Sequence, residues 1–268
     1  MNERKPYPTD LSDAEWSRLA HLIPQPKTGG RPVKYDRREI LNAILYVVRA
    51  GCAWRLLPHD FPSWRIAYHY FRQWKHTGVW KRIHDRLRKL LRKAEGRHVQ
   101  ASAAILDSQS VKTTERGGER GYDAGKQVNG RKRHILVDTL GLLLVVCVTA
   151  ASTQDRDGAR LLLEVLTKQW TRLRLIWADA AYAGELIEWV WQLRHRRRLN
   201  LEIVRRAQGS KGFVVQPKRW IVERTFGWLN RCRRLSKDYE YLTETSEAMI
   251  HVAMINLMVR RLARRPTF

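Results

Sequence analysis

The sequence predicts an α/β protein in two parts: an all-α module followed by a domain built on a mixed β-sheet. Apolar residues recur every three to four positions as far as Lys93, as in amphipathic helices. From Ala101 onward, short β-rich runs alternate with helical patterns, which is typical of a mixed sheet. The polar stretch Glu95–His98 separates the two patterns, so we expect a helical domain over residues 1–97 and a mixed-sheet domain over residues 98–268.

Four helices are predicted in the first part. They begin near Asp13, after Asp36 and after Ser63, and the fourth spans Val79–Lys93. Asp and Ser side chains at these starts suit N-caps, because they accept hydrogen bonds from the first free N–H groups of a helix. Short basic helices of this kind often read DNA, although a helical cap with solvated basic residues remains the alternative.

The second part opens with the pattern strand, loop, hairpin. An apolar run, Ala103–Leu106, ends on Asp107, and a polar glycine-rich loop follows. Two β-rich runs, Arg131–Asp138 and Leu142–Thr149, are joined by a short turn and form the predicted hairpin. This order predicts a sheet whose first strand presents a carboxylate at its end.

Strands and helices then alternate to the end of the chain. The predicted strands are Leu173–Trp177, which leads to Asp179, and Leu201–Val204. Four helices are predicted in this part: one that begins at Asp157, and three over Gly184–Leu193, Lys218–Leu235 and Ser246–Leu262. The helix over Lys218–Leu235 is basic. The helix over Ser246–Leu262 is apolar on almost every side, which predicts that it is buried.

Charge and composition narrow the function classes. Lys and Arg outnumber Asp and Glu by 51 to 26, a formal charge of +25, and the excess is spread along the chain. A protein this basic is expected to meet a polyanion, above all nucleic acid. The three cysteines lie far apart without a C-x-x-C pair, which argues against a zinc ribbon or a disulfide framework. With no apolar signal core and no run long enough to span a bilayer, we expect a cytoplasmic protein.

Three acids stand out by position: Asp107 and Asp179 after strands, and Glu223 early on the basic helix. Cleavage of a phosphodiester needs an activated water and a stabilised leaving oxygen, which two divalent ions supply. Mg²⁺ prefers carboxylate oxygens. Taken singly, each Asp also fits a turn residue, and Glu223 also fits an i,i+4 pair with Arg219. The competing acids are Asp138 at the hairpin turn and Asp155 and Asp157 at a helix start.

Several segments in order resemble the DDE transposases of bacterial insertion sequences. They are GCAWRLLPHDFPSWRIAYHYFRQW, DSQSVKTTE, GGERGYDAGKQVNGRKRHILVDTLGLLL, TQDRDGA, LRLIWADAAYAGE and RWIVERTFGWLNRCRRLSKDYE. The resemblance implies an RNase H-like catalytic domain over residues 98–268, preceded by a helical DNA-binding domain over residues 1–97. It also implies that Asp107, Asp179 and Glu223 are the catalytic, metal-binding acids, with Mg²⁺ as the cofactor and Mn²⁺ able to substitute.

The last helix segment resembles the family signature of Tyr, Arg, Glu and Lys only in part. Arg219 and Glu223 match it, whereas Gln216 stands at the Tyr position and Asn230 at the Lys position, with Arg231 beside it. This departure leaves the phosphate contacts near the site open. Candidate DNA contacts form two basic clusters, one around the hairpin and one after Glu223. They are Lys126, Arg131, Lys132 and Arg133 with His134, and Arg219, Arg231, Arg233, Arg234 and Lys237.

The function expected is that of a transposase, which binds the ends of its element and catalyses metal-dependent cleavage and strand transfer. The partners are then double-stranded DNA, as terminal inverted repeats and target, and at least a second copy of the chain. The loop Gly117–Gly125 lacks the phosphate-loop order, so no nucleotide cofactor is expected. We also expect no membrane partner and an association with the bacterial nucleoid. Two alternatives remain: a non-catalytic DNA-binding protein on the same fold, and a metal-dependent nuclease that does not join strands.

Overall fold

The structure is a computed structural model that describes residues 4–25, 35–115, 117–167, 172–197, 199–205 and 218–265, with no side chains described for residues 193–197. It forms two compact units, each assembled from separate segments. One comprises Met1–Glu95, Arg231–Ser236 and Ala248–Phe268, and the other Gly96–Asn230 and Lys237–Glu247. The functional division between residues 97 and 98 remains a prediction.

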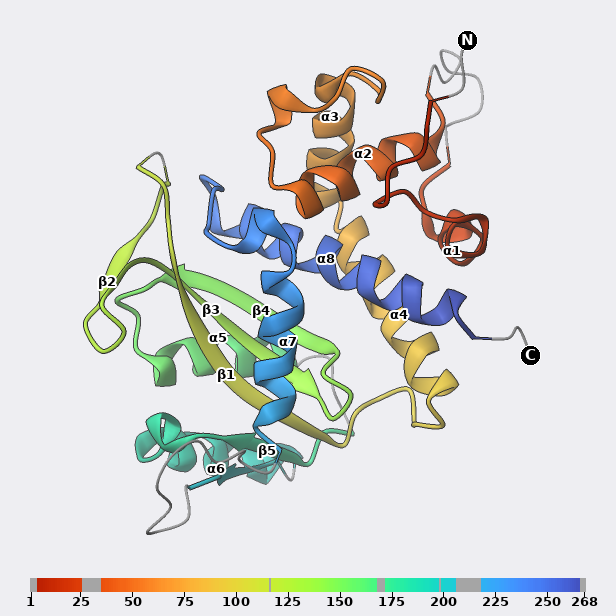
Figure 1. Cartoon of the computed structure of the whole chain (residues 1–268). Helices are drawn as coiled ribbons and strands as arrows, with labels where there is room; N and C mark the ends of the chain where they lie inside the picture. Colours follow the sequence, from red (N-terminus) through yellow and green to blue (C-terminus); the bar gives the residue numbers. More distant parts are fainter. Residues whose placement is uncertain are drawn as a thin grey trace. The chain divides into compact units, whose positions relative to one another are not determined.

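The first unit is helical, and its first four helices follow the predicted periodicity (Figure 1). They are α1 (Asp13–Leu19), α2 (Arg37–Ala50), α3 (Trp64–His76) and α4 (Val79–Ala94), with 3₁₀ turns η1 (Ala20–Leu22) and η2 (Trp54–Leu56). Ser12 and Glu15 form a reciprocal capping box at the start of α1, and Asp36 caps α2 by accepting from the Arg38 N–H. The starts of α1 and α2 are therefore fixed locally, by side chains that satisfy otherwise free N–H groups, whereas the predicted cap Ser63 makes no such hydrogen bond at the start of α3.

A short segment from late in the chain completes the helical unit. The predicted basic helix over Lys218–Leu235 is wrong in extent, because the helix ends at Asn230 and is followed by the 3₁₀ turn η4 (Arg233–Leu235). The Arg234 guanidinium donates to the Cys52 carbonyl at 3.2 Å. Gly51, in the left-handed conformation at φ 76°, leaves no room for a Cβ, which would lie 2.8 Å from the Arg233 Cβ. These contacts draw the backbone away from a helical path.

The longest helix among the described residues, α8 (Thr243–Ala263), extends the predicted apolar helix at its N-terminal end. Its residues Met249, Ile250, Met254 and Met258 are almost fully buried. Within the described ranges, no helix combines the length and apolar character that crossing a bilayer requires.

The second unit is built on a six-stranded mixed sheet. Its strands are β1 (Ala103–Lys112), β2 (Gly121–Asp123), β3 (Val128–Asp138), β4 (Leu143–Ala150), β5 (Leu175–Ala178) and β6 (Asn200–Ile203). The order is β2-β3-β1-β5-β6, and β4 also pairs with β3. β1 is antiparallel to β3 and parallel to β5, which is parallel to β6. An antiparallel β1–β3–β4 meander joined to parallel strands, with helices α5 (Asp155–Thr167) and α6 (Glu185–Arg197) after β4 and β5, is the RNase H-like arrangement predicted.

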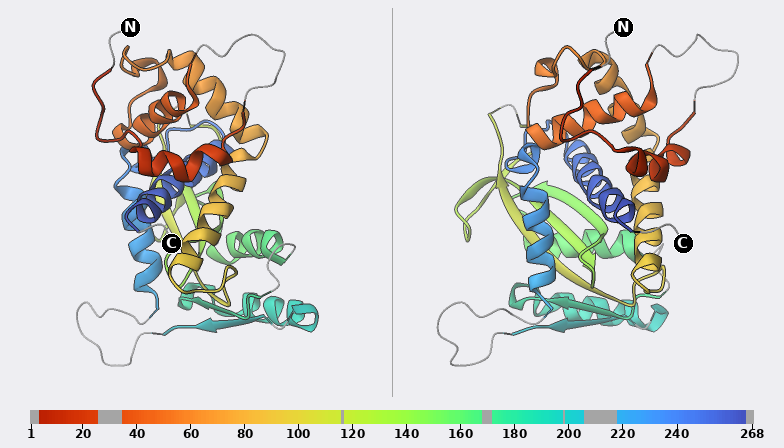
Figure 2. Two further views of the ribbon diagram at one scale, coloured as in Figure 1. Left: turned by 90° about the vertical axis from the view of Figure 1, so that its right-hand side faces the viewer. Right: turned by 45° about the vertical axis from the view of Figure 1, so that its right-hand side comes forward.

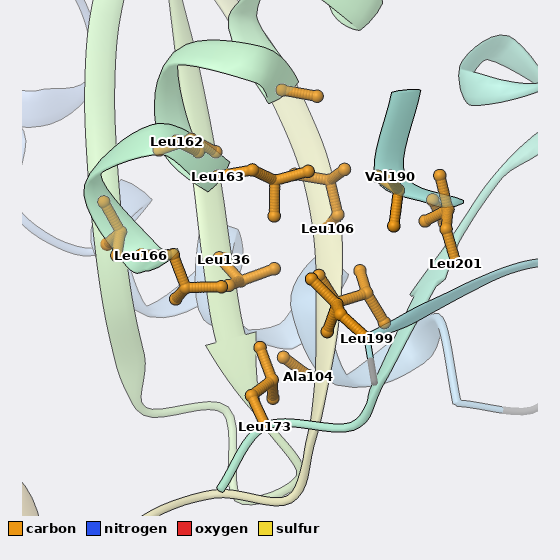
Figure 3. Packing of buried hydrophobic residues seen from close by; sticks show 14 of the residues in the cluster. Ala104, Leu106, Leu136, Leu162, Leu163, Leu166, Leu173, Val190, Leu199 and Leu201 are labelled. Carbon is orange, nitrogen blue, oxygen red and sulfur yellow. The ribbon is translucent and has the colours of Figure 1, made fainter. Parts of the chain in front are cut away.

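Helices cover the two faces of this sheet differently. α5 lies on one face and α7 (Trp220–Asn230) on the other, as the views in Figures 1 and 2 agree. The α5 face carries the main apolar core, in which Ala104 and Leu106 of β1 pack with Leu162, Leu163 and Leu166 of α5 (Figure 3). Because successive strand residues point to opposite faces, Ile105 and Asp107 point to the α7 face.

The first strand is longer than predicted. Asp107 does not end it: β1 continues to Lys112, and Asp107 pairs in register with Ile135 near its middle. Ser108 and Ser110 continue the ladder because β3 extends far enough to pair with them. β2 lies in the loop where no strand was predicted.

A histidine pair lies between α4 and α8 in the helical unit. The rings of His84 and His251 meet edge to face with centroids 5.0 Å apart. Burial lowers the pKa of His84 to about 4, against the opposing effect of Asp85, and burial lowers the pKa of His251 to about 3, aided by His84. Both rings are therefore neutral in the folded protein at neutral pH.

Acid should destabilise this unit through the histidine pair. Below the unfolded pKa of about 6.5, the unfolded chain binds protons that the folded rings do not, so stability falls as the pH drops from about 6.5 towards about 4. We expect a loss of about 2 kcal/mol per histidine, measured as the free energy of urea unfolding at pH 7 and pH 4.5. The double variant His84→Gln, His251→Gln should lose less on acidification, and the exposed-site control His76→Gln should follow the parent. Parallel losses in all three proteins would contradict this.

Candidate active site

Asp107 lies on the α7 face of β1, at the centre of the sheet. Its Oδ1 accepts a hydrogen bond from the Ser108 N–H at 2.7 Å. Only 15% of the side chain is exposed. Burial raises the pKa of Asp107 to about 6, and the Ser108 N–H and Arg219 oppose this rise. The buried Asp107 carboxylate is therefore in a place where a bound cation would stabilise its charged form.

Asp179 follows β5, the strand parallel to β1. It is the N-cap of the 3₁₀ turn η3 (Ala180–Tyr182), and its Oδ1 accepts from the Ala181 N–H at 2.9 Å. The register pairs Ala103 with Leu175 and Ile105 with Trp177. Because the two parallel strands run side by side, their acids reach the same region of the sheet.

A single guanidinium joins the two acids. The Arg219 Nη2 lies 3.2 Å from the Asp179 Oδ2 and 3.7 Å from the Asp107 Oδ2. All three side chains are largely buried, with 15–25% exposure. The structure thus brings together three of the residues singled out from sequence, two acids and one cation, although they are far apart in the chain.

Glu223 lies one turn beyond Arg219 on α7 and is exposed. Its N–H reaches the Arg219 carbonyl at 3.4 Å, so the two side chains leave the helix on similar faces. It does not join Asp107 and Asp179: over the described ranges, no three or more Asp, Glu, His or Cys residues gather as a metal site. Asn230 is the last residue of α7, and Gln216 lies outside the described residues.

The turn between β3 and β4 holds α7 in place. Arg224 Nη2 donates to the Leu140 carbonyl at 3.0 Å, and Thr225 Oγ1 donates to the Gly141 carbonyl at 2.9 Å. Gly141 has φ 78°, and a Cβ there would lie 2.9 Å from the Trp228 ring. This turn therefore sets the position of α7, which carries Glu223 and directly follows Arg219.

A second polar network, which was not predicted from the sequence, lies on the opposite face of the sheet behind Asp107. Ser108 Oγ donates to Asp155 Oδ1 at 2.7 Å, and Ser110 Oγ donates to Asp123 Oδ2 at 2.6 Å. The Lys132 ammonium lies 3.2 Å from Asp155 and 3.4 Å from Asp123. The network ties β1 to β3 and to the start of α5, and it braces the residue next to Asp107.

The competing acids have other roles in the structure. Asp138 is fully buried, and its Oδ1 accepts from the N–H groups of Leu140 and Leu142, as expected of a hairpin-turn residue. Asp155 starts α5 and belongs to the Ser108 network. Asp157 is more than half exposed and lies 3.6 Å from Arg160.

Three basic residues of the hairpin cluster are not on the surface. Arg131 and Arg133 are fully buried and Lys132 is 5% exposed, so their predicted place along a DNA backbone is wrong for this fold. Arg131 donates to Asp238 Oδ1, to the Glu240 and Tyr241 carbonyls and to Ser246 Oγ. The neighbouring His134 is also buried, and its pKa is lowered to about 4 by burial. These side chains hold the fold together.

The remaining candidates for DNA contact divide by exposure. Arg234 is 9% exposed and is committed to the Cys52 carbonyl, so its predicted surface role is also wrong. Lys126, Arg231, Arg233 and Lys237 are exposed. The Lys126 ammonium also reaches the Ser108 carbonyl at 3.3 Å, which places this lysine beside the acid-bearing strand.

An RNase H-like sheet that brings two acids together from neighbouring strands is typical of enzymes that use divalent metal ions on nucleic-acid phosphodiesters. The family described as the transposase DDE domain matches residues 98–258, and a family described as transposases of the IS4/5 family matches residues 11–84. The chain belongs to the DDE transposases of bacterial insertion sequences. It is accordingly a DNA-binding, metal-dependent enzyme of DNA cleavage and transfer.

Individual relatives agree with this family. The chain is 32% identical over 119 residues to a 16.2 kDa protein of insertion element IS402 from Burkholderia cepacia, covering 41% of this chain and 78% of the relative. It is 30% identical over 139 residues to the transposase described for IS402 from the same organism, covering 48% of this chain and 60% of the relative. It is 29% identical over 96 residues to the protein y4sN of Sinorhizobium fredii, covering 36% of this chain and 74% of the relative.

The burial of Arg131 predicts its effect on stability. The side chains of Arg131 and Asp238 are 0% and 1% exposed, so Arg131→Met leaves a buried carboxylate without its cation. We expect a loss of about 3 kcal/mol in the free energy of unfolding, measured by urea denaturation at pH 7. Arg120→Met, at an exposed position before β2, is the matched control and should change stability little. Equal, small effects in both variants would show that Arg131 does not hold this segment.

Proposed function

We propose that this chain is the transposase that moves an insertion sequence, and that Asp107, Asp179 and Glu223 are its catalytic acids. The observation that carries the proposal is the pairing of Asp107 and Asp179, from two parallel strands, around a shared cation. Each acid uses one oxygen to accept a backbone N–H and turns the other towards that cation. Two such hard oxygen donors suit Mg²⁺, and Mn²⁺ is able to replace it.

Bound divalent ions would activate the attacking water or hydroxyl and stabilise the leaving oxygen. Asp107 and Asp179 would hold these ions on the α7 face of the sheet. Glu223 would supply the third carboxylate from the exposed face of α7, one turn beyond Arg219. Strand transfer exchanges one phosphodiester for another, so the reaction proceeds without a nucleotide cofactor.

Terminal inverted repeats and target DNA are the proposed DNA partners. The helical domain over residues 1–97 would recognise the ends, and the domain over residues 98–268 would carry the chemistry. Arg219, Lys126, Arg231, Arg233 and Lys237 would contact phosphates. Two ends must be cut and joined together, so we propose that a dimer or larger assembly acts on DNA, in the cytoplasm and associated with the nucleoid.

The test uses purified protein, Mg²⁺ and a labelled duplex taken from the DNA that flanks the gene. The parent should give nicked and joined products, whereas Asp107→Asn, Asp179→Asn and Glu223→Gln should each lower the rate by about 10³-fold. Loss of one carboxylate removes charge that holds the ions, without changing the size of the side chain.

Asp157→Asn is the matched control, because Asp157 is an exposed acid at the start of α5. It should retain both products. Cutting without joining by the parent would indicate a nuclease, and DNA binding without any metal-dependent product would indicate a non-catalytic DNA-binding protein.

Salt should weaken DNA binding steeply, since each phosphate contact releases counterions. The triple variant Arg231→Gln, Arg233→Gln, Lys237→Gln should lower the slope of log K against log salt by about 2 to 3, because these side chains are exposed. Fluorescence anisotropy with the same duplex over a salt series measures it. An unchanged slope would remove these residues from the DNA surface.

A further inference from the structure

Arg219 stands where a cation is required between the two acids. Its guanidinium lies 3.2 Å from one oxygen of Asp179 and 3.7 Å from one oxygen of Asp107, and 18% of its side chain is exposed. Two carboxylates turned towards the same partly buried gap would repel each other without a positive charge between them. The guanidinium supplies that charge in the structure.

The other oxygen of each acid is already committed. Asp107 Oδ1 accepts from the Ser108 N–H and Asp179 Oδ1 accepts from the Ala181 N–H. Each carboxylate is thereby fixed in orientation, and the oxygen that faces Arg219 is the one that it presents to a cation. A guanidinium and a metal ion would therefore use the same two oxygens.

The backbone before Arg219 also bears on its placement. Lys218 adopts the left-handed conformation at φ 72°, which is uncommon for a residue with a side chain. Its ammonium lies 4.3 Å from the centroid of the Trp177 ring, on the strand that leads to Asp179. This contact anchors the start of α7 beside β5 and directs Arg219 to the acids.

We propose that Arg219 is the resident counter-cation of the metal-free site, which divalent metal must displace in order to bind Asp107 and Asp179. The inference rests on the proposed function, in which both acids are metal ligands. Displacement would release the guanidinium to a phosphate of bound DNA, so that metal loading and DNA contact are coupled through one side chain. Arg219 is then a positioning residue for the acids before metal binds.

Direct binding of Mn²⁺ in the absence of DNA tests the competition. Titration of the full chain, followed by calorimetry and by the electron paramagnetic resonance of free Mn²⁺, compares the parent with Arg219→Gln and Arg219→Lys. Removing the competing charge should make Mn²⁺ bind Arg219→Gln about tenfold more tightly, while Arg219→Lys should stay close to the parent. Equal or weaker binding by Arg219→Gln would overturn the proposal, as would identical affinities of the Gln and Lys variants.

Thermal unfolding provides a second measurement, in which the Arg219→Gln substitution should lower stability without metal although it strengthens metal binding. In EDTA, Arg219→Gln should have a lower Tm than the parent, because the carboxylates then face each other without a cation. Saturating Mn²⁺ should raise the Tm of Arg219→Gln by more than it raises that of the parent. A variant that is merely damaged would be destabilised with and without metal alike, and this result would overturn the proposal.

Two controls separate this proposal from the function on which it rests. Arg160→Gln removes an arginine that lies 3.6 Å from Asp157 and 3.5 Å from Glu185, and it should leave Mn²⁺ affinity unchanged. Asp107→Asn and Asp179→Asn should abolish Mn²⁺ binding at the site. If both retain parental binding, the assignment of the acids as ligands fails; if they lose it while Arg219→Gln binds no more tightly than the parent, only the role of Arg219 fails.

Discussion

The alternation of side chains along β1 is the constraint on which the second unit depends. Ala104 and Leu106 point into the α5 core, and Asp107 points to the other face, where α7 lies. A shift of one residue in the pairing of β1 with β3 would bury the acid in the apolar core and turn Ala104 and Leu106 to the opposite face. The register that pairs Asp107 with Ile135 thus positions the candidate site and the core together.

Part of the basic excess is structural. Arg131 satisfies an acid and two carbonyls of the segment that follows the helical turn η4, and Lys132 joins two acids behind the site. Buried cations of this kind require partners, because an unpaired buried charge is costly. The formal charge of +25 therefore overstates the positive charge that is exposed on the surface, to which residues such as Lys126 and Lys237 contribute.

The sequence predicted what depends on local pattern. Helical periodicity, caps such as Asp36 and the hairpin identified most elements, and the strand before Asp179 placed that acid at a strand end. The sequence did not show the full length of β1, because Ser108 and Ser110 read as loop residues until β3 and distant acids pair with them. Likewise, the burial of Arg131 depends on Asp238, which is 107 residues away.

The acids illustrate the same limit at the site itself. Position along the chain and family resemblance selected Asp107, Asp179 and Glu223, yet spacing alone carries no information on which of them are close in the folded chain. Two lie against Arg219, because β1 and β5 are neighbours, while Glu223 stays exposed one turn further along α7. Arg219 directly precedes α7, the helix that carries Glu223. The proposed competition between the Arg219 guanidinium and a metal ion for two carboxylates therefore takes place at the start of the helix that carries the third acid.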